Sequence, residues 1–227
     1  MDEMEKLISG FRSFRRENFT GSRSHFQDLV HQGQSPRIMI IACSDSRVDP
    51  AIITRAEPGD LFVVRNVANL VPPCQDDHHY HGTSAALDYA VRGLGVAHVI
   101  VFGHACCGGI RLLMESGSSA TNPTDTTDPV DATDFVKSWM EIARPARDEV
   151  VRLLPDAGMA EQAAACEKLG VKTSLANLMT FPWIAGAAAA GELRLHGWYF
   201  DIVEGALCAL DAKNAEFRPV EDLFPLA

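Results

Sequence analysis

Three short apolar runs, rich in β-branched residues, constrain the fold of this chain more than any other feature. They read IMIIAC at 38–43, LFVVRN at 61–66 and AHVIVFGH at 97–104. Continuous apolar runs of this length are typical of parallel strands that are buried on both faces. Helical patterns lie between and after these runs, at about 50–56, 82–95 and 108–115. The alternation of strands and helices predicts an α/β fold around a mainly parallel central sheet flanked by helices.

The two ends of the chain predict additions to that core. Residues 4–18 place Leu7, Ile8, Phe11 and Phe14 at helical spacing between charged residues. An amphipathic arm of this kind buries only one stripe, so we expect it to pack on another surface, such as a partner subunit. Farther along, helical residues fill 158–189, with interruptions expected at Gly170 and Pro182. The segments LRLHGWYFDI and LCALDA then predict a terminal hairpin at the edge of the sheet.

Composition excludes several classes of function. The net charge of −10 argues against nucleic acid as a partner, because nucleic-acid binding needs a basic face. No run of eighteen apolar residues is present to span a membrane. The charged start of the sequence lacks the apolar core of a secretory signal, so we expect a cytoplasmic protein. In that reducing compartment, six cysteines in a chain of 227 residues indicate metal binding or catalysis rather than a disulfide scaffold.

Cysteine and histidine occur where two predicted strands end. Cys43 closes the first apolar run and His104 closes the third. Ligands gather at the carboxyl ends of the strands in open α/β sheets, so these side chains meet if the strands are neighbours. Cys107 follows His104 at a chelating His-x-x-Cys spacing, whereas Cys106 is one residue short and should point elsewhere. Two thiolates and one imidazole favour zinc.

The number of ligands decides what kind of zinc site this is. Three protein ligands leave a fourth position for water, which is the pattern of a catalytic site. A fourth ligand would make the site structural, and the sequence offers Cys74, His78, His79 and His81 as candidates. Asp45 and Arg47 favour catalysis, because Asp45 can accept a hydrogen bond from the metal's water while Arg47 keeps Asp45 ionised and aimed. Without Arg47, Asp45 itself could bind the metal as its fourth ligand.

The residues that carry this chemistry resemble a known family. CSDSR at 43–47 and GHACCGG at 103–109 are similar to the motifs of the β-class carbonic anhydrases. The likeness extends through EPGDLFVVRNVAN at 57–69, GTSAALDYAV at 82–91 and LHGWYFDI at 195–202. The resemblance implies a single domain over 1–227, with a four-stranded parallel core, a further edge strand and a helical arm at 1–33 that packs on a partner. It also implies a homodimer or a tetramer built as a dimer of dimers.

The resemblance further implies an activity and a role for each site residue. The reaction would be the reversible hydration of carbon dioxide to bicarbonate and a proton. One Zn²⁺ per subunit would be held by Cys43, His104 and Cys107, and the Asp45–Arg47 dyad would orient a hydroxide on the metal. The substrate contacts implied are Gln34, Phe62, Val67, Tyr89 and Gly108.

The resemblance also points to a subgroup of the family. Gln34 matches the plant-like members. Ile40 stands where another branch carries a tryptophan of an inhibitory bicarbonate site, although Arg65 matches another member of that site. We therefore expect a non-allosteric enzyme.

Three other functions remain compatible with these residues. The same scaffold and ligands would suit the hydrolysis of carbon disulfide or carbonyl sulfide, whose molecules are also linear and apolar. A non-catalytic zinc-binding scaffold would have Asp45 permanently on the metal. A redox protein would use the adjacent thiols of Cys106 and Cys107.

Overall fold

The computed structural model describes residues 2–19, 25–77, 79–116 and 135–225. A six-stranded sheet crosses the middle of this part of the chain in the order β2-β1-β3-β4-β5-β6. The strands are β1 (Ile38–Cys43), β2 (Leu61–Asn66), β3 (His98–His104), β4 (Arg194–Asp201), β5 (Ala206–Leu210) and β6 (Phe217–Pro219). Strands β1 to β4 run parallel, and β5 and β6 are added antiparallel. The predicted parallel core and edge strand are confirmed, and β6 extends that edge by one more strand.

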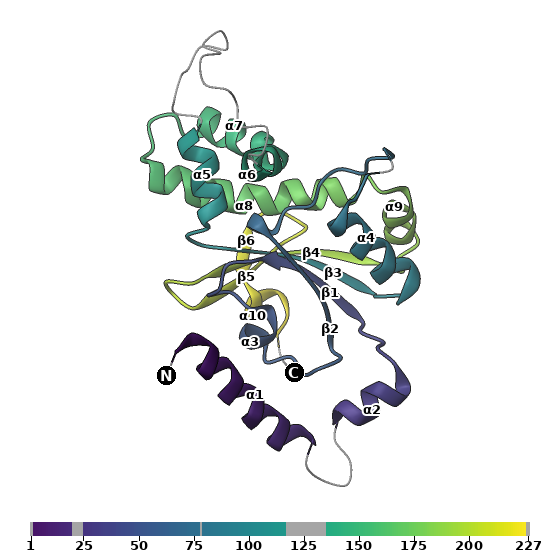
Figure 1. The fold of residues 1–227 in the computed structure, drawn as a ribbon. Coiled ribbons are helices and arrows are strands. Elements are labelled where there is room, and N and C mark those ends of the chain that lie inside the picture. The colour runs from purple at the N-terminus through teal and green to yellow at the C-terminus, as the bar shows by residue number, and fades with distance from the viewer. Residues whose placement is uncertain (1, 20–24, 78, 117–134, 226–227) are drawn as a thin grey trace.

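Helices cover both faces of the sheet. The helices before β3 are α1 (Glu3–Phe19), α2 (His25–Gln32), α3 (Pro50–Thr54) and α4 (Gly82–Asp88). Those after it are α5 (Gly108–Ser116), α6 (Phe135–Met140), α7 (Arg144–Leu153), α8 (Met159–Leu178), α9 (Pro182–Ala189) and α10 (Val220–Leu223). Three short turns are also helical: η1 (Val67–Asn69), η2 (Tyr89–Gly93) and η3 (Glu141–Ala143). Figure 1 shows α4, α8 and α9 on one side of the sheet and α1, α3 and α10 on the other.

The alternation of side chains along β1 divides the core between the two faces. Met39 and Ile41 pack with Val171 of α8 and Ile184 of α9. Ile40 points the other way, into a cluster with residues of β3 that α3 borders. Because both faces of β1 are buried, each of its apolar residues loses its contact with water, which is why the whole run is apolar.

Two sequence expectations about helices need correction. Gly170 does not interrupt the long helix, because α8 runs continuously from Met159 to Leu178. Gly170 is buried, and a Cβ there would lie at an ordinary contact distance of 3.7 Å from the Ile110 side chain, so packing against α5 outweighs the low helix propensity of glycine. The segment 82–95 is not one regular helix, since α4 passes into the wider η2 turn. Pro182 does begin a new helix, α9, as expected.

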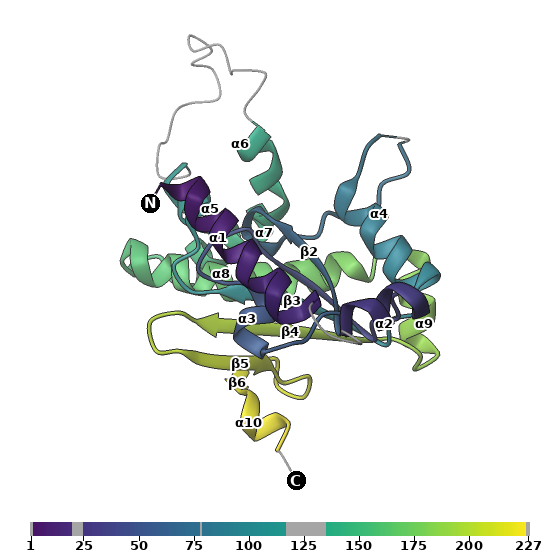
Figure 2. The ribbon, with the colours of Figure 1, turned by 60° about the horizontal axis from the view of Figure 1, so that its bottom comes forward.

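The N-terminal arm leaves its apolar side chains in solvent. Within the described helix α1 no residue is buried, and Leu7 and Phe11 are 68% and 59% exposed. Figure 1 shows α1 apart from the main body, on the side of α3 and α10, and in Figure 2, where that side comes forward, α1 crosses in front of the sheet. None of the helices in the described part of the chain has the length and apolar character needed to span a bilayer.

Candidate metal centre and active site

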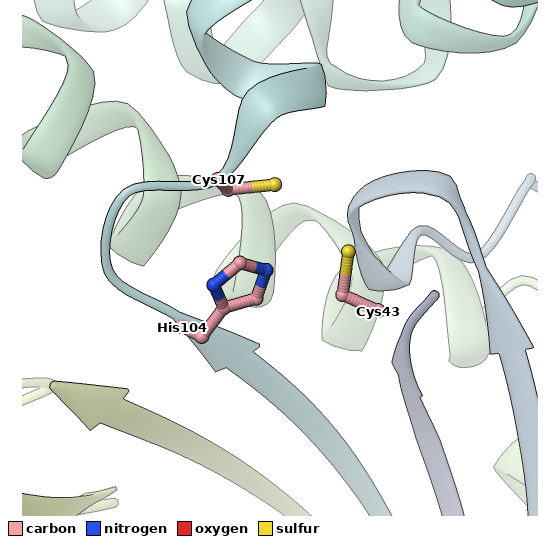
Figure 3. A group of neighbouring side chains, drawn as sticks. All are labelled: Cys43, His104 and Cys107. Carbon is pink, nitrogen blue, oxygen red and sulfur yellow. The ribbon is translucent and has the colours of Figure 1, made fainter. Parts of the chain in front are cut away.

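Cys43, His104 and Cys107 meet at the carboxyl edge of the sheet. Cys43 ends β1 and His104 ends the adjacent parallel strand β3. The turn after β3 returns Cys107 to the same place, just before α5 begins. Their ligand atoms all lie within 4.8 Å of one another, and all three residues are buried. Figure 3 shows the three side chains converging on one space. The structure therefore assembles the predicted ligand set.

The hydrogen bonds of His104 prepare its ring for a metal. Nδ1 lies 2.8 Å from the carbonyl oxygen of Ala105, which can only accept, so Nδ1 carries the hydrogen. That assignment leaves the lone pair on Nε2. Among the described residues Nε2 has no hydrogen-bond partner, although it is buried. A buried acceptor without a partner is costly, and a metal ion would satisfy it.

The two buried thiols also fit a divalent cation. A hydrogen bond from Cys107 stabilises the Cys43 thiolate and lowers the pKa of Cys43. The same contact raises the pKa of Cys107, and burial raises it further. A second thiolate therefore forms beside the first only when positive charge compensates it. Two thiolates with a neutral imidazole are one of the ligand sets that bind catalytic Zn²⁺, so the residues present fit this ion.

Arg47 holds both oxygens of the Asp45 carboxylate. Nε of Arg47 lies 2.9 Å from Oδ1 and Nη2 lies 2.7 Å from Oδ2. The backbone N–H of Arg47 adds a third bond to Oδ1 at 3.0 Å. These bonds hold the pKa of Asp45 well below its usual range. The Asp45 carboxylate is outside the group of metal-binding atoms within the described residues, so Arg47 holds it beside that group as an ionised acceptor.

Arg65 braces the loop that carries these residues. Its Nε donates to the Cys43 carbonyl at 2.9 Å, and its Nη2 donates to the Asp45 carbonyl at 2.7 Å. Its Nη1 pairs with Asp49 at 3.0 Å, and Asp49 in turn caps α3 through the N–H groups of residues 51 and 52. The sequence feature that could have indicated this bracing role is the charged Arg65 within the mostly apolar run LFVVRN. Nε, Nη1 and Nη2 of Arg65 thus each have a hydrogen-bond partner within the chain. The expected absence of an inhibitory bicarbonate site stays a prediction.

The predicted substrate residues fall into two groups. Val67 and Gly108 lie beside the ligands: Gly108 follows Cys107 directly, and a Cβ at Gly109 would be 2.9 Å from Cγ1 of Val67. Phe62 and Tyr89 form a separate pair, with ring centroids 5.8 Å apart. Phe62 is paired with Met39, four residues before Cys43.

Four residues span about 13 Å of strand, so within one chain this pair is distant from the ligands. Gln34 is exposed and precedes β1. The structure thus joins only part of the predicted substrate site in one chain.

The candidates for a fourth protein ligand lie elsewhere. Cys74, His79 and His81 line a surface hollow beside α9, and they are absent from the metal-binding group found among the described residues. His78 lies outside those residues. Cys106 is exposed, and its backbone has the left-handed φ of 58°, so its thiol departs from the cluster as predicted.

One buried acid was not anticipated from the sequence. Glu167 of α8 is 5% exposed, accepts a hydrogen bond from the Cys107 N–H at 2.9 Å, and accepts another from the Tyr199 hydroxyl at 2.8 Å. Burial raises the pKa of Glu167 despite these two bonds. In the sequence a glutamate beside a lysine is typical of an exposed helix face, and nothing in it indicates this contact.

Comparison with known proteins gives the family. The family model described as Carbonic anhydrase matches residues 38–207. "Beta carbonic anhydrase 3" of Arabidopsis thaliana is 34% identical over 94% of this chain and 80% of its own length. The solved β-carbonic anhydrase CcaA has a TM-score of 0.84 at 34% identity, covering 96% of this chain and all of that one.

A second solved structure extends the comparison to an assembly. This structure is of one of two tetrameric β-carbonic anhydrases from Sordaria macrospora, and it has a TM-score of 0.68 at 28% identity. The match covers 92% of this chain and 94% of that chain. The family match, the curated relative and the shared fold agree with the motifs at 43–47 and 103–109, and with the Cys-His-Cys group. This chain belongs to the β-class carbonic anhydrases.

Proposed function

We propose that the chain catalyses the reversible hydration of carbon dioxide to bicarbonate and a proton, with the Asp45–Arg47 pair orienting the attacking oxygen. The observation that carries this proposal is the ionised Asp45 carboxylate, held by Arg47 beside three converging zinc ligands. Cys43, His104 and Cys107 would hold the ion. When bound, zinc supplies Lewis acidity that lowers the pKa of a coordinated water.

Asp45 contributes orientation rather than proton abstraction. A carboxylate with a strongly lowered pKa is a poor base but a dependable hydrogen-bond acceptor. It therefore turns the O–H of the nucleophile toward itself and leaves an oxygen lone pair directed at the carbon of the substrate. Because Arg47 already donates to both carboxylate oxygens, Asp45 stays out of the metal's coordination sphere.

A second copy of the chain would complete the substrate site. Val67 supplies an apolar surface beside the ligands, and an apolar wall favours an uncharged linear substrate over water. Phe62 and half-exposed Tyr89 are too far along their strand and helix to add to that wall within one chain. The exposed apolar face of α1 offers the contact through which a partner would dock. We therefore propose a homodimer or a dimer of dimers in which these residues, with Gln34, face the neighbouring subunit's zinc ligands.

The decisive experiment measures carbon dioxide hydration by stopped flow on protein of known zinc content. The rate should rise in proportion to zinc, up to one equivalent per chain. Carbon disulfide and carbonyl sulfide serve as comparison substrates in the same preparation. Hydrolysis of either compound without hydration of carbon dioxide would contradict the proposal, as would a fully zinc-loaded protein that is inactive on all three.

A further inference from the structure

One peptide unit links the zinc ligands to both the Asp45–Arg47 pair and a buried acid. It is the peptide between Cys106 and Cys107. Its carbonyl, on Cys106, accepts a hydrogen bond from Nη2 of Arg47 at 3.1 Å. Its N–H, on Cys107, donates to Oε1 of Glu167 at 2.9 Å. Because the C=O and N–H of a trans peptide point in opposite directions, the two side chains hold this unit from opposite sides.

The conformation of this turn needs such anchors. Cys106 has a φ of 58°, in the left-handed region that a side chain with a Cβ disfavours. Without external bonds, the peptide would gain by rotating toward an ordinary conformation. Such a rotation would carry the Cα of Cys107 with it, and a metal ligand must be placed to within a few tenths of an ångström.

Glu167 is itself firmly placed. Its second oxygen accepts from the hydroxyl of Tyr199, which is 5% exposed on β4. Nζ of the neighbouring Lys168 lies over the Tyr199 ring, 5.1 Å from its centroid. The acid is thus anchored to β4 and contacts the ligand turn from α8, while Arg47 reaches the same turn from the loop after β1.

We infer that Glu167 is a positioning residue for the metal centre: through the Cys106–Cys107 peptide it fixes the Cys107 ligand and the carbonyl that supports Arg47. The part concerning Arg47 rests on the function proposed above, whereas the part concerning Cys107 does not. Partners that orient a metal ligand in this way typically contribute 10- to 100-fold to metal affinity.

The test measures zinc affinity by competition with a chromophoric chelator, which needs no activity. Glu167→Leu should weaken zinc binding about 10- to 100-fold. Glu167→Gln keeps an oxygen acceptor for the Cys107 N–H, so its affinity should stay within about three-fold of the wild type. The residue lines a cavity of about 650 Å³, which leaves room for the leucine side chain. Cobalt(II) loading adds a second readout, because displacement of the Cys107 sulfur should change the thiolate charge-transfer bands in the leucine variant alone.

A control separates positioning from general loss of stability. Leu178→Ala lies on the same helix at a fully buried site and should lower the melting temperature without changing zinc affinity. Wild-type affinity in Glu167→Leu, or an equal loss in Leu178→Ala, would overturn the inference. If Glu167→Leu does not fold, Tyr199→Phe takes its place, since it frees one oxygen of Glu167. It should weaken zinc binding in the same direction, and unchanged affinity in that variant would count against the inference.

A double-mutant cycle tests the shared peptide directly. Both changes are made in an Asp45→Ala background, because Arg47→Ala would otherwise free Asp45 to bind the metal. Arg47→Ala and Glu167→Leu remove the two anchors of one unit, so in that background their effects on zinc affinity should not multiply. Purely multiplicative losses would show that the two residues act separately and would overturn the link between them. A zinc-loaded wild type that fails to hydrate carbon dioxide would refute the proposed function but leave the positioning of Cys107 by Glu167 intact.

Discussion

Arg47 and Asp45 form a two-point fork in which every hydrogen bond points from the guanidinium to the carboxylate, at 2.9 and 2.7 Å. An asparagine at position 45 would place an NH₂ donor against one donor of Arg47 and would leave a single, uncharged acceptor oxygen. Asp45→Asn should therefore keep its zinc and lose about 10- to 100-fold in kcat. Stopped-flow hydration together with metal analysis checks both parts. Wild-type kcat in a zinc-replete variant would contradict the proposed role of Asp45.

The adjacent thiols of Cys106 and Cys107 allow a matched comparison. Cys107 is buried in the ligand group, whereas Cys106 is exposed. We expect Cys107→Ser to purify with almost no zinc, because a hydroxyl is a much poorer ligand for this ion than a thiolate. Cys106→Ser should retain one equivalent per chain. Metal analysis after dialysis against a weak chelator measures the difference, and equal zinc contents would show that the ligand is wrongly assigned.

Two neighbouring glycines should respond differently to alanine. A Cβ at Gly109 would lie 2.9 Å from Val67 and 3.2 Å from Ala68, whereas a Cβ at Gly108 meets no described atom within 4 Å. Gly109→Ala overpacks the contact between α5 and η1 and should lower the free energy of unfolding by about 1–3 kcal/mol. Gly108→Ala should change stability little. Urea titration of both variants provides the measurement, and similar midpoints would refute the packing described for Gly109.

The pair formed by His98 and His196 should make the folded protein sensitive to acid. Nδ1 of His98 lies 3.0 Å from Nε2 of His196, and burial lowers the pKa of both rings below their ordinary value of 6.5. Arg194 lowers the pKa of both further, and Arg37 does so for His98. Below pH 6.5 the unfolded chain binds protons that the folded pair does not. The stability that the pair contributes is therefore present above pH 6.5 and is lost as the pH falls.

His196→Gln should consequently flatten the fall of the melting temperature between pH 7.5 and about 5.5 relative to wild type. The exposed His79 supplies the control, since His79→Gln should leave the slope unchanged. Differential scanning fluorimetry at several pH values measures both slopes. Parallel curves for wild type and His196→Gln would mean that this pair does not set the acid response.

The apolar face of α1 should govern assembly. Leu7 and Phe11 are mostly exposed in the single chain, which is costly unless a partner covers them. The double variant Leu7→Glu/Phe11→Glu should shift the mass measured by light scattering toward the monomer. It should also lower activity, because Phe62 and Tyr89 would no longer face a neighbouring site. Arg12→Glu on the same helix should leave the mass unchanged, and an unaltered mass in the double variant would exclude α1 as the contact.

The sequence alone determined the parallel core and which three side chains, Cys43, His104 and Cys107, converge at its carboxyl edge. The runs at 38–43, 61–66 and 97–104 became β1, β2 and β3 because strands buried on both faces need continuous apolar residues. Cys43 and His104 could be placed at one edge because parallel strands end on the same side of a sheet. The spacing from His104 to Cys107 is local, so a turn of three residues fixes it without reference to the rest of the chain.

Only the tertiary structure decided which residues from distant segments contact the ligand group at the carboxyl edge of the sheet. Glu167 accepts a hydrogen bond from the N–H of Cys107, which lies 60 residues earlier in the chain. In the sequence, Glu167 looks like any exposed helical acid. Gly170 was expected to break a helix, because conformational preference was visible in the sequence and the close packing of α5 on α8 was not. Phe62 and Tyr89 match a substrate wall in sequence, yet the register of β1 and β2 separates them from the ligands. Periodicity and spacing encode local geometry, whereas burial and hydrogen-bond partners depend on contacts between segments that only folding brings together.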